Sequence, residues 1–396
     1  MIGVSKLYCG SVEPHDALRY GTPGETPAGR ATLESGKPVV VWNVTRRCNL
    51  RCVHCYSASD AGVAPDELST SEAEAMIDDL AAWGAPVLLF SGGEPMARQD
   101  LLPLVRRASA AGIRTAMSTN GTLLDERSAG ALKDAGLGYA GISLDGLRET
   151  HDRFRGADGC FERMLAGVEA CRRVGLKVGF RLTITKRNFR DMPGVFRLLA
   201  QMGVPRICFY HLVYSGRGAE LREEDIDHAA ARETIDRIID ETARLHADGF
   251  PAEVLTVDNH ADGVFLLRRL ERENPAKAAA ALALLRRNGG NASGRRIACV
   301  SWDGTIHPDQ FWRTVTVGNV RRQPFSETWT SDHPLLAALR NRRELLGGKC
   351  GRCGYVDICN GNMRVRAEAV HGDPWAEDPA CYLTEEEIAE RLPPTP

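Results

Sequence analysis

Residues 38–56 read PVVVWNVTRRCNLRCVHCY and join a short apolar run to three closely spaced cysteines. The run at 38–44 is rich in β-branched residues, which predicts a buried strand. Cys48, Cys52 and Cys55 follow on one tight loop with the spacing CxxxCxxC. Three such thiolates can hold three irons of a 4Fe–4S cube and leave the fourth iron open to another ligand. A zinc knuckle, or unrelated buried thiols, is the alternative, although zinc sites favour CxxC pairs with a second pair nearby.

Strand-like and helix-like segments alternate from this stretch to about residue 215. The predicted strands, all short and apolar, are 38–44, 86–91, 113–118, 138–144, 177–184 and 206–213. The predicted helices, all amphipathic, are 70–83 (capped by Thr70 or Ser71), 98–111, 122–135, 159–174 and 189–202. A glycine follows each of the last four helices, as a left-handed C-cap requires. Six β-α repeats predict an α/β fold with a parallel sheet, either doubly wound or an incomplete barrel, whose ligand lies at the carboxyl ends of the strands.

The rest of the chain lacks this alternation of strand-like and helix-like segments. Residues 222–287 look helical and charged, and they end in the loop NGGNASG at 288–294. Short strands and turns follow, whereas the first 37 residues show no clear periodicity. We therefore divide the chain into an N-terminal extension, a β-α domain, a helical connection and a small C-terminal domain, at 1–37, 38–221, 222–294 and 295–396.

Composition excludes several classes of protein. The 396 residues carry 52 acidic and 50 basic side chains, a formal charge of −2, so no overall positive field would recruit nucleic acid. The apolar runs are too short to span a bilayer, and the first residues lack the regions of a signal peptide. We therefore expect a cytoplasmic protein without membrane contact. In that reducing compartment, twelve cysteines indicate metal or redox chemistry rather than disulfides.

A second group of cysteines lies near the C-terminus. Cys350, Cys353 and Cys359 have the spacing CxxCx5C, and Cys381 completes a set of four ligands for a second 4Fe–4S cluster. A structural zinc ribbon is the alternative. Cys299 has no nearby cysteine partner. Four other isolated cysteines are interpreted as small core residues, namely Cys9, Cys160, Cys171 and Cys208.

With both cysteine groups in view, residues 38–215 resemble the radical S-adenosylmethionine (radical SAM) superfamily. The C-terminal group is similar to the auxiliary-cluster domain called SPASM. The resemblance implies a partial (β/α)6 barrel followed by a small SPASM- or twitch-like domain. It also implies S-adenosylmethionine and two 4Fe–4S clusters as cofactors. A full SPASM domain has three further cysteines, which this chain lacks, so we expect one auxiliary cluster.

The same resemblance suggests which residues bind S-adenosylmethionine. The motif SGGEP at 91–95 would place Glu94 on the methionyl ammonium, and Arg181 resembles the basic residue that pairs with the methionyl carboxylate. Tyr56 would lie near the adenine. The glycines of the motif and the polar residues at the next two strand ends would line the rest of the cofactor: Gly92, Gly93, Ser118, Asn120, Ser143 and Asp145.

Softer similarities point to the tetrapyrrole-modifying branch of the superfamily. They lie in MIGVSKLYCG at the start, FYHLVYSGRG at 209–218, NGGNASG at 288–294 and the segment 307–329. This branch implies an iron tetrapyrrole substrate, 12,18-didecarboxysiroheme, that loses two acetate side chains to give Fe-coproporphyrin III. It also implies a low-potential electron donor, ferredoxin or flavodoxin. Candidate substrate contacts are His211, Tyr214, Arg217, His260 and His307, each of which could equally be a solvated or core residue.

Three other functions stay open at this stage. One is the related radical SAM step of haem d1 synthesis, and another is a SPASM enzyme that modifies peptides. The third is a zinc-stabilised binding protein without catalysis. No residue is assigned as catalytic from the sequence.

Overall fold

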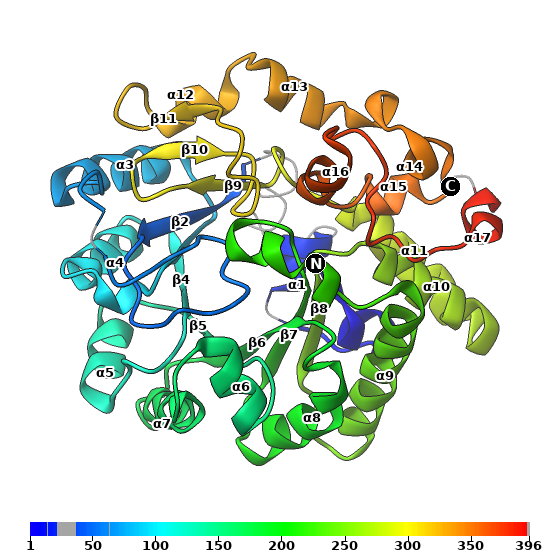
Figure 1. Ribbon diagram of the computed structural model, residues 1–396, viewed down its shortest axis with the longest axis horizontal. Coiled ribbons are helices and arrows are strands. Elements are labelled where there is room, and N and C mark those ends of the chain that lie inside the picture. The colour runs from blue at the N-terminus through cyan, green and yellow to red at the C-terminus, as the bar shows by residue number, and fades with distance from the viewer. Residues whose placement is uncertain (14, 22–36, 63, 394–396) are drawn as a thin grey trace.

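The computed structural model describes residues 1–13, 15–21, 37–62 and 64–393, and one open eleven-stranded sheet runs through it (Figure 1). Its order is β1-β8-β7-β6-β5-β4-β3-β2-β9-β10-β11. The strands are β1 (Ile2–Gly3), β2 (Val39–Thr45), β3 (Val87–Gly92), β4 (Arg114–Thr119), β5 (Ala140–Ser143), β6 (Val178–Ile184), β7 (Arg206–His211), β8 (Glu253–Val257), β9 (Ile297–Val300), β10 (Thr305–His307) and β11 (Gly318–Asn319).

Helices follow most strands and surround the sheet, with α4, α5, α7, α8 and α9 on its outer side (Figure 1). The α-helices are α1 (Asp16–Tyr20), α3 (Thr70–Trp83), α4 (Leu101–Ala110), α5 (Glu126–Asp134), α6 (Arg148–Arg155), α7 (Cys160–Arg173), α8 (Met192–Gln201), α9 (His228–Ala247), α10 (Ala261–Glu273), α11 (Pro275–Asn288), α12 (Phe325–Thr330), α13 (Pro334–Arg340), α14 (Gly348–Arg352), α15 (Val356–Cys359), α16 (Arg364–His371) and α17 (Glu385–Ala389). Shorter helical turns are η1 (Ser5–Cys9), η2 (Pro95–Ala97), η3 (Phe189–Asp191), η4 (Gly216–Glu224) and η5 (Arg342–Leu345).

The six predicted strands are all present, as β2 to β7, and they pair in sequence order and in parallel. The glycines after four of the predicted helices have positive φ, as expected of left-handed helix ends: Gly112, Gly136, Gly175 and Gly203. The cap of α3 differs from the prediction. Ser69, and not Thr70 or Ser71, accepts the backbone N–H of Glu72, and Glu72 returns a contact to the Ser69 backbone.

A seventh parallel strand lies inside the segment that the sequence suggested to be helical. β8 pairs with β7 and is buried along its whole length. Its five residues, EVLTV, follow a long charged helix, and so short a run is easily missed between helices. The first residues of the chain also join the sheet, because β1 pairs antiparallel with β8. The domain boundaries stay a prediction from the sequence.

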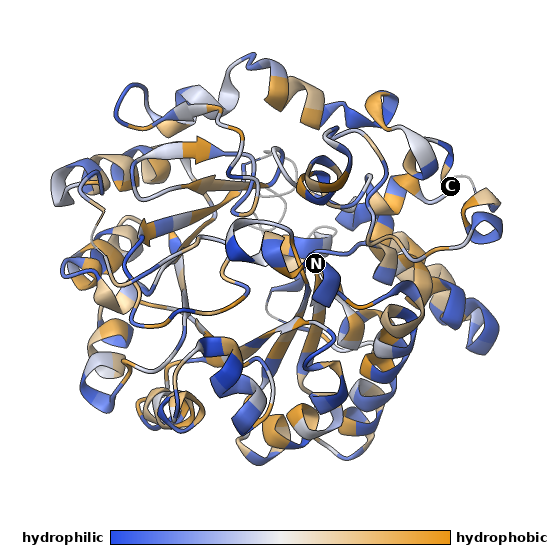
Figure 2. Cartoon of the chain, viewed as in Figure 1, coloured by the Kyte–Doolittle hydropathy of each residue, from blue (hydrophilic) through white to orange (hydrophobic). Residues whose placement is uncertain are grey.

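The C-terminal part of the chain extends the other edge of the sheet. β9 pairs in parallel with β2, with Val41 opposite Cys299, and β10 and β11 continue antiparallel. Hydrophobic residues concentrate on the strands, and hydrophilic ones face outward on the helices (Figure 2). In the described part of the chain, no helix has the length and apolarity needed to cross a membrane.

This topology places the candidate ligand-binding residues at the carboxyl ends of the parallel strands. The cysteine loop follows β2, Glu94 follows β3 and Asn120 follows β4. His211 is the last residue of β7, and Asp258 comes directly after β8. Since the carboxyl ends of parallel strands share one edge, ligands are expected there.

Candidate functional site

The three cysteines after β2 form one cluster. Cys48, Cys52 and Cys55 pack together with Leu50 and Cys160 in a small apolar group. Burial, helped by the two neighbouring thiols, raises the pKa of Cys48 to about 12. Cys160 is fully buried at the start of α7, as its interpretation as a core residue requires, but no sequence pattern indicates that it lies beside this loop.

Arg155 holds one side of this cysteine loop. Its Nη1 lies 3.4 Å from the Cys52 sulfur, and its Nη2 forms an ion pair of 2.5 Å with Asp145. His54, within the loop, lies 3.4 Å from the same carboxylate. Although burial raises the pKa of Asp145, the charge of Arg155 holds it below its usual value. Arg155 ends α6, a hydrophilic helix that the sequence analysis did not predict because it lacks an apolar stripe.

Arg217 holds the other side of the loop. Its Nε donates to the Cys52 carbonyl at 2.8 Å and its Nη1 to the Ser59 carbonyl at 2.9 Å, while its backbone N–H donates to the Cys55 carbonyl. Gly216 approaches so closely that a Cβ there would lie 2.4 Å from the Tyr56 carbonyl oxygen. Two of the three guanidinium nitrogens of Arg217 are therefore bound to the loop, and a contact with substrate stays a prediction.

The SGGEP turn at 91–95 packs against the backbone at the start of the cysteine loop. A Cβ on Gly93 would lie 2.2 Å from the Arg47 carbonyl oxygen, and one on Gly92 would lie 2.6 Å from that of Thr45. The Gly93 and Glu94 N–H groups donate to these same carbonyls at 2.8 and 2.9 Å. Both glycines therefore admit the chain's own backbone at the start of the cysteine loop. Their contact with the cofactor stays a prediction.

Glu94 is a fully buried carboxylate. It accepts hydrogen bonds from the Thr119 hydroxyl at 2.7 Å and from the backbone N–H groups of Asn120 and Met96 at 2.8 and 3.1 Å. No side chain in the described part of the chain forms an ion pair with it. Burial raises its pKa. A buried carboxylate without a cation fits an ammonium ligand, which agrees with the residue's predicted role.

Arg181 supplies the opposite charge three strands away. Its Nη1 donates to the Ser118 hydroxyl at 2.9 Å, and its Nε is buried without a hydrogen bond. The side chain crosses β5 at Gly141, where a Cβ would lie 2.2 Å from Nε. Within the described residues it has no acidic partner. Glu94 and Arg181 thus offer an anion and a cation to a zwitterionic amino acid, as found in S-adenosylmethionine.

Three of the other residues predicted to contact the cofactor bind protein side chains in this structure. Asn120 donates to the Asn49 side chain at 2.8 Å, and the Tyr56 hydroxyl donates to Asn43 at 2.8 Å while its ring packs edge-on against Phe311. Asp145 pairs with Arg155 and lies near His54, so it positions the cysteine loop, and its contact with the cofactor stays a prediction. Ser143 lies half-buried at the end of β5, opposite Arg181 in the sheet.

The four C-terminal cysteines also come together. Burial, and then the nearness of Cys381, Cys350 and Cys353, raises the pKa of Cys359 well above its usual value. All twelve cysteines are free thiols. Cys299 does not join this group. It is fully buried in β9, where its sulfur accepts a hydrogen bond from Asn43.

The spacing of the donors distinguishes a cluster from a single ion. Among the described residues, no three histidine, cysteine or carboxylate side chains converge as ligands of one metal ion would. A single zinc requires such convergence, whereas each thiolate of a 4Fe–4S cube binds a different iron. Within the described residues, neither cysteine group is therefore arranged as the ligand set of a single ion.

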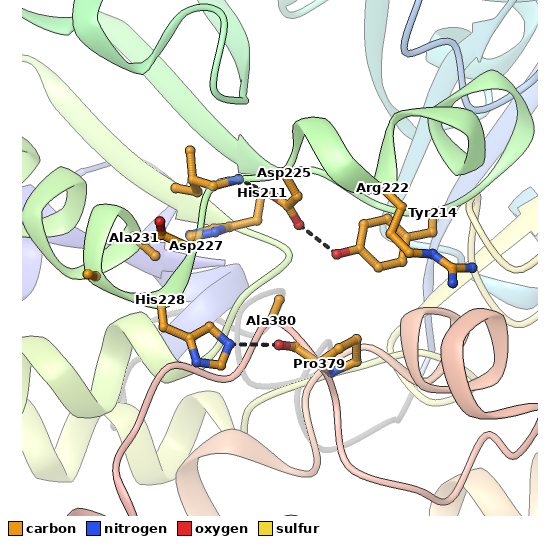
Figure 3. Close-up of a pocket in the computed structure, with 11 residues that line it drawn as sticks. His211, Tyr214, Arg222, Asp225, Asp227, His228, Ala231, Pro379 and Ala380 are labelled. Carbon is orange, nitrogen blue, oxygen red and sulfur yellow. Dashed lines mark hydrogen bonds between the residues drawn. The ribbon is translucent and has the colours of Figure 1, made fainter.

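A cavity of about 570 Å³ lies beyond the end of β7 (Figure 3). Two of the predicted substrate contacts, His211 and Tyr214, line it, and the other lining residues are Arg222, Asp225, Ile226, Asp227, His228, Ala229, Ala231, Pro379 and Ala380. The Tyr214 hydroxyl donates to Asp225 at 2.8 Å. Ala380 directly precedes Cys381, so the cavity borders the C-terminal cysteine group.

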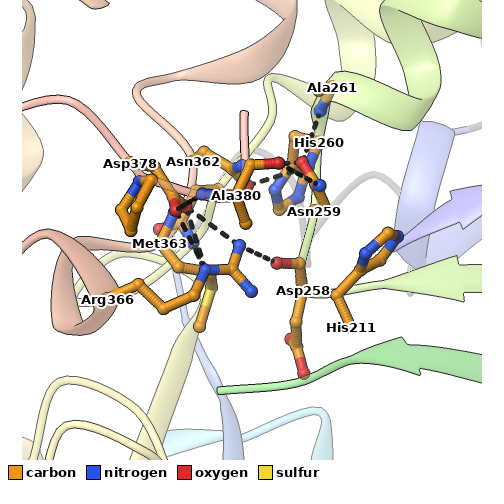
Figure 4. A network of polar contacts seen from close by, with 12 residues as sticks. His211, Asp258, Asn259, His260, Ala261, Asn362, Met363, Arg366, Asp378 and Ala380 are labelled. Atoms are coloured by element: carbon orange, nitrogen blue, oxygen red, sulfur yellow. Dashed lines mark hydrogen bonds and ion pairs between the residues drawn. The ribbon is translucent and has the colours of Figure 1, made fainter. Parts of the chain in front are cut away.

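A buried polar network beside this cavity joins the C-terminal segment to the residues that follow β7 and β8 (Figure 4). Arg366 and Asp378 form an ion pair of 2.9 Å in which neither side chain is exposed. Arg366 also donates to the carbonyls of Leu212 and Asp258, at 3.0 and 2.5 Å. The network thus joins α16 to the ends of β7 and β8.

Two predicted substrate contacts serve the protein's interior. The His260 backbone N–H donates to Asn362 at 2.8 Å within this network. His307 is buried, with one ring nitrogen 3.0 Å from the Ser301 hydroxyl and the other 2.6 Å from the Val315 carbonyl. Neither lines the cavity. Their prediction as substrate contacts finds no support in the structure, and both read as core residues.

Two family models match the chain. Residues 42–199 match the radical SAM superfamily, and residues 292–354 match the iron–sulfur cluster-binding SPASM domain. The fold is similar to that of SuiB from Streptococcus suis bound to its precursor peptide, with a TM-score of 0.68 and 18% identity over 89% of this chain and 79% of that one.

Curated relatives are more similar in sequence. The chain is 55% identical to the Fe-coproporphyrin III synthase of Methanosarcina barkeri, over 98% of this chain and 99% of the relative. It is 44% identical to the pre-heme d1 synthase of Dinoroseobacter shibae, over 93% and 91%. A PqqA peptide cyclase of Gluconobacter oxydans is 28% identical, over 89% and 92%.

The cysteine groups should load independently. We expect the triple variant Cys48→Ala, Cys52→Ala, Cys55→Ala to keep about half the iron and sulfide of the wild type, because the C-terminal four-cysteine set is intact. It should make no 5′-deoxyadenosine. Iron and sulfide analysis after anaerobic reconstitution measures the first outcome. Iron near zero, with zinc in its place, would show that the C-terminal group is a zinc ribbon.

Glu94→Gln should weaken S-adenosylmethionine binding at least about tenfold, or about 1.4 kcal/mol, because it removes the negative charge but keeps the shape. Equilibrium binding to the reconstituted protein measures this. Glu149→Gln, an exposed carboxylate on α6, is the matched control and should leave the affinity unchanged. Equal affinity in Glu94→Gln and wild type would remove Glu94 from the cofactor site.

Asp378→Asn should lower the free energy of unfolding by about 3 kcal/mol, because it leaves the Arg366 charge buried without its partner. Urea unfolding followed by circular dichroism provides the measurement. Glu126→Gln removes the carboxylate charge of the exposed pair with Arg173 and should change the free energy of unfolding far less than Asp378→Asn does. Similar losses in the two variants would argue against a stabilising buried network.

Proposed function

Because this chain belongs to the radical SAM superfamily, we propose that it removes two acetate side chains from 12,18-didecarboxysiroheme and leaves Fe-coproporphyrin III. The observation that carries the proposal is the 55% identity, over nearly the whole of both chains, to a protein named Fe-coproporphyrin III synthase. Haem biosynthesis is the process in which such a product is used. The two cysteine groups, the Glu94 carboxylate and the Arg181 guanidinium supply the residues that this chemistry needs.

Each cofactor has a defined set of residues in this chain. Cys48, Cys52 and Cys55 would hold the cluster that leaves one iron open, and the four C-terminal cysteines the auxiliary cluster. When bound, the first cluster and S-adenosylmethionine supply a 5′-deoxyadenosyl radical that takes hydrogen from the substrate. Glu94 and Arg181 orient the methionyl group by its two charges. The apolar group around the cysteine loop keeps water away from the thiolates.

Arg155 and Arg217 have a supporting role in this proposal. The Arg155 guanidinium lies against the Cys52 sulfur, and Arg217 binds two loop carbonyls. Positive charge beside thiolates offsets the negative charge that builds up when three of them share a small apolar space. The same contacts hold the loop in one conformation, so the cysteines are already in place before a cluster binds.

The substrate would enter at the cavity beyond β7. The cavity lies between η4, which holds the cysteine loop, and the residues that precede Cys381. Its volume of about 570 Å³ falls in the range of small-molecule sites. The Arg222 guanidinium, which lies 5.6 Å from the centre of the Tyr214 ring, brings a cation to the cavity wall for a carboxylate side chain.

The runner-up is the radical SAM step of haem d1 synthesis, which the 44% identity to a pre-heme d1 synthase favours. That reaction would leave oxo groups where side chains had been. Peptide modification is supported less, since the peptide cyclase relative is 28% identical.

We further propose a low-potential electron donor, ferredoxin or flavodoxin, and a cytoplasmic location. The reaction consumes electrons that the chain does not itself supply. The many free thiols are suited to a reducing compartment.

Anaerobic incubation with S-adenosylmethionine, reductant and 12,18-didecarboxysiroheme tests the function, with mass analysis of the pigment. We expect Fe-coproporphyrin III together with the released acetate groups. A dioxo pigment would instead support the haem d1 reaction. Unchanged pigment beside rapid 5′-deoxyadenosine formation would contradict both tetrapyrrole reactions while leaving the radical SAM assignment intact.

A further inference from the structure

His211 has the geometry of a metal ligand held by a carboxylate. It ends β7, is 4% exposed and lines the cavity beyond that strand (Figure 3). Its Nε2 lies 2.9 Å from Asp262, whose other oxygen accepts the Tyr382 hydroxyl at 2.7 Å. Asp262 is 1% exposed, so this pair is shielded from water and fixes the imidazole ring.

The contact with Asp262 determines which ring nitrogen is free. An ionised carboxylate only accepts hydrogen bonds, so Nε2 of the neutral ring carries the proton and Nδ1 the lone pair. Nδ1 makes no hydrogen bond within the described chain, yet it is not among the fully buried atoms that lack a partner. Nδ1 is therefore not completely shielded, and it belongs to a side chain that lines the cavity.

A histidine with this arrangement is suited to bind a metal. Ligating histidines commonly donate their second ring N–H to a carboxylate, which fixes the tautomer and raises the basicity of the ligating nitrogen. The described chain shows no converging protein ligands that would hold an ion of its own there. A metal at His211 would therefore arrive with a ligand that already fills most of its coordination positions.

We propose that His211 Nδ1 is the axial ligand of the substrate's tetrapyrrole iron, which rests on the proposed function. The bond replaces a water or an open position on the iron, and no electron is transferred. It would fix the height and tilt of the macrocycle at the barrel mouth. Asp262 is then a positioning residue that acts through His211.

His228 is the natural comparison, since it lines the same cavity. Its Nε2 lies 2.9 Å from the Pro379 carbonyl, and the side chain is exposed at the start of α9. Among the described residues, no buried carboxylate contacts its ring. We therefore expect it to contribute little to iron binding.

The test compares two pigments on the anaerobically reconstituted protein: ferric coproporphyrin III and metal-free coproporphyrin III. Difference absorption and EPR spectra report the axial ligand, and titrations give the two dissociation constants. In wild type, the ferric pigment should show an axial imidazole. His211→Ala should lose that signature, raise the dissociation constant of the ferric pigment at least about tenfold and change that of the metal-free pigment less than about twofold.

Two further variants sharpen the result. His228→Ala should keep the wild-type spectrum, and Asp262→Asn should weaken ferric pigment binding while changing metal-free binding little. Added imidazole should restore the signature in His211→Ala, which a misfolded variant would not show.

An unchanged axial signature in His211→Ala, equal losses for both pigments, or a signature lost only in His228→Ala would overturn the inference alone. If wild type binds neither pigment and leaves didecarboxysiroheme unchanged, the proposed function fails, and the inference fails with it.

Discussion

Two arginines hold the cysteine loop, and the rest of the site depends on this clamp. Arg155 contacts the Cys52 sulfur from α6, and Arg217 binds loop carbonyls from η4. Three thiols in an apolar group would repel one another once ionised, so a nearby cation favours the thiolate forms that a cluster binds. Asp145 in turn fixes Arg155 through a buried ion pair. Because burying such a pair costs desolvation energy, we infer that the pair positions Arg155 rather than stabilises the fold.

One of the two arginines also connects the cysteine loop to the cavity, because Arg217 belongs to η4. η4 binds the cysteine loop through Arg217, and the same element forms a wall of the cavity through Arg222. On the opposite wall, Pro379 and Ala380 lead into Cys381. The buried Arg366–Asp378 pair fixes that wall to the ends of β7 and β8. A substrate in the cavity would therefore lie between two cysteine groups whose separation the fold sets.

Sequence reasoning succeeded where a pattern is local. Apolar runs located the six strands, and cysteine spacing located both groups of thiols. It failed where a role depends on a distant partner. Arg217 lies beside a glycine pair that resembles a turn, and only folding brings it 2.8 Å from the Cys52 carbonyl. Arg155 sits in a polar helix with no apolar period. β8 is five residues long, and the ligand geometry of His211 depends on Asp262, which is 51 residues away.

The most direct test of the account is EPR of the reduced protein with and without S-adenosylmethionine. Two 4Fe–4S signals are expected, because each cysteine group holds its own cube. Only the signal from the three-cysteine loop should change when S-adenosylmethionine is added, since only that cube keeps an open iron. A single signal, or two signals that both ignore S-adenosylmethionine, would contradict the claim that this loop builds the reactive site.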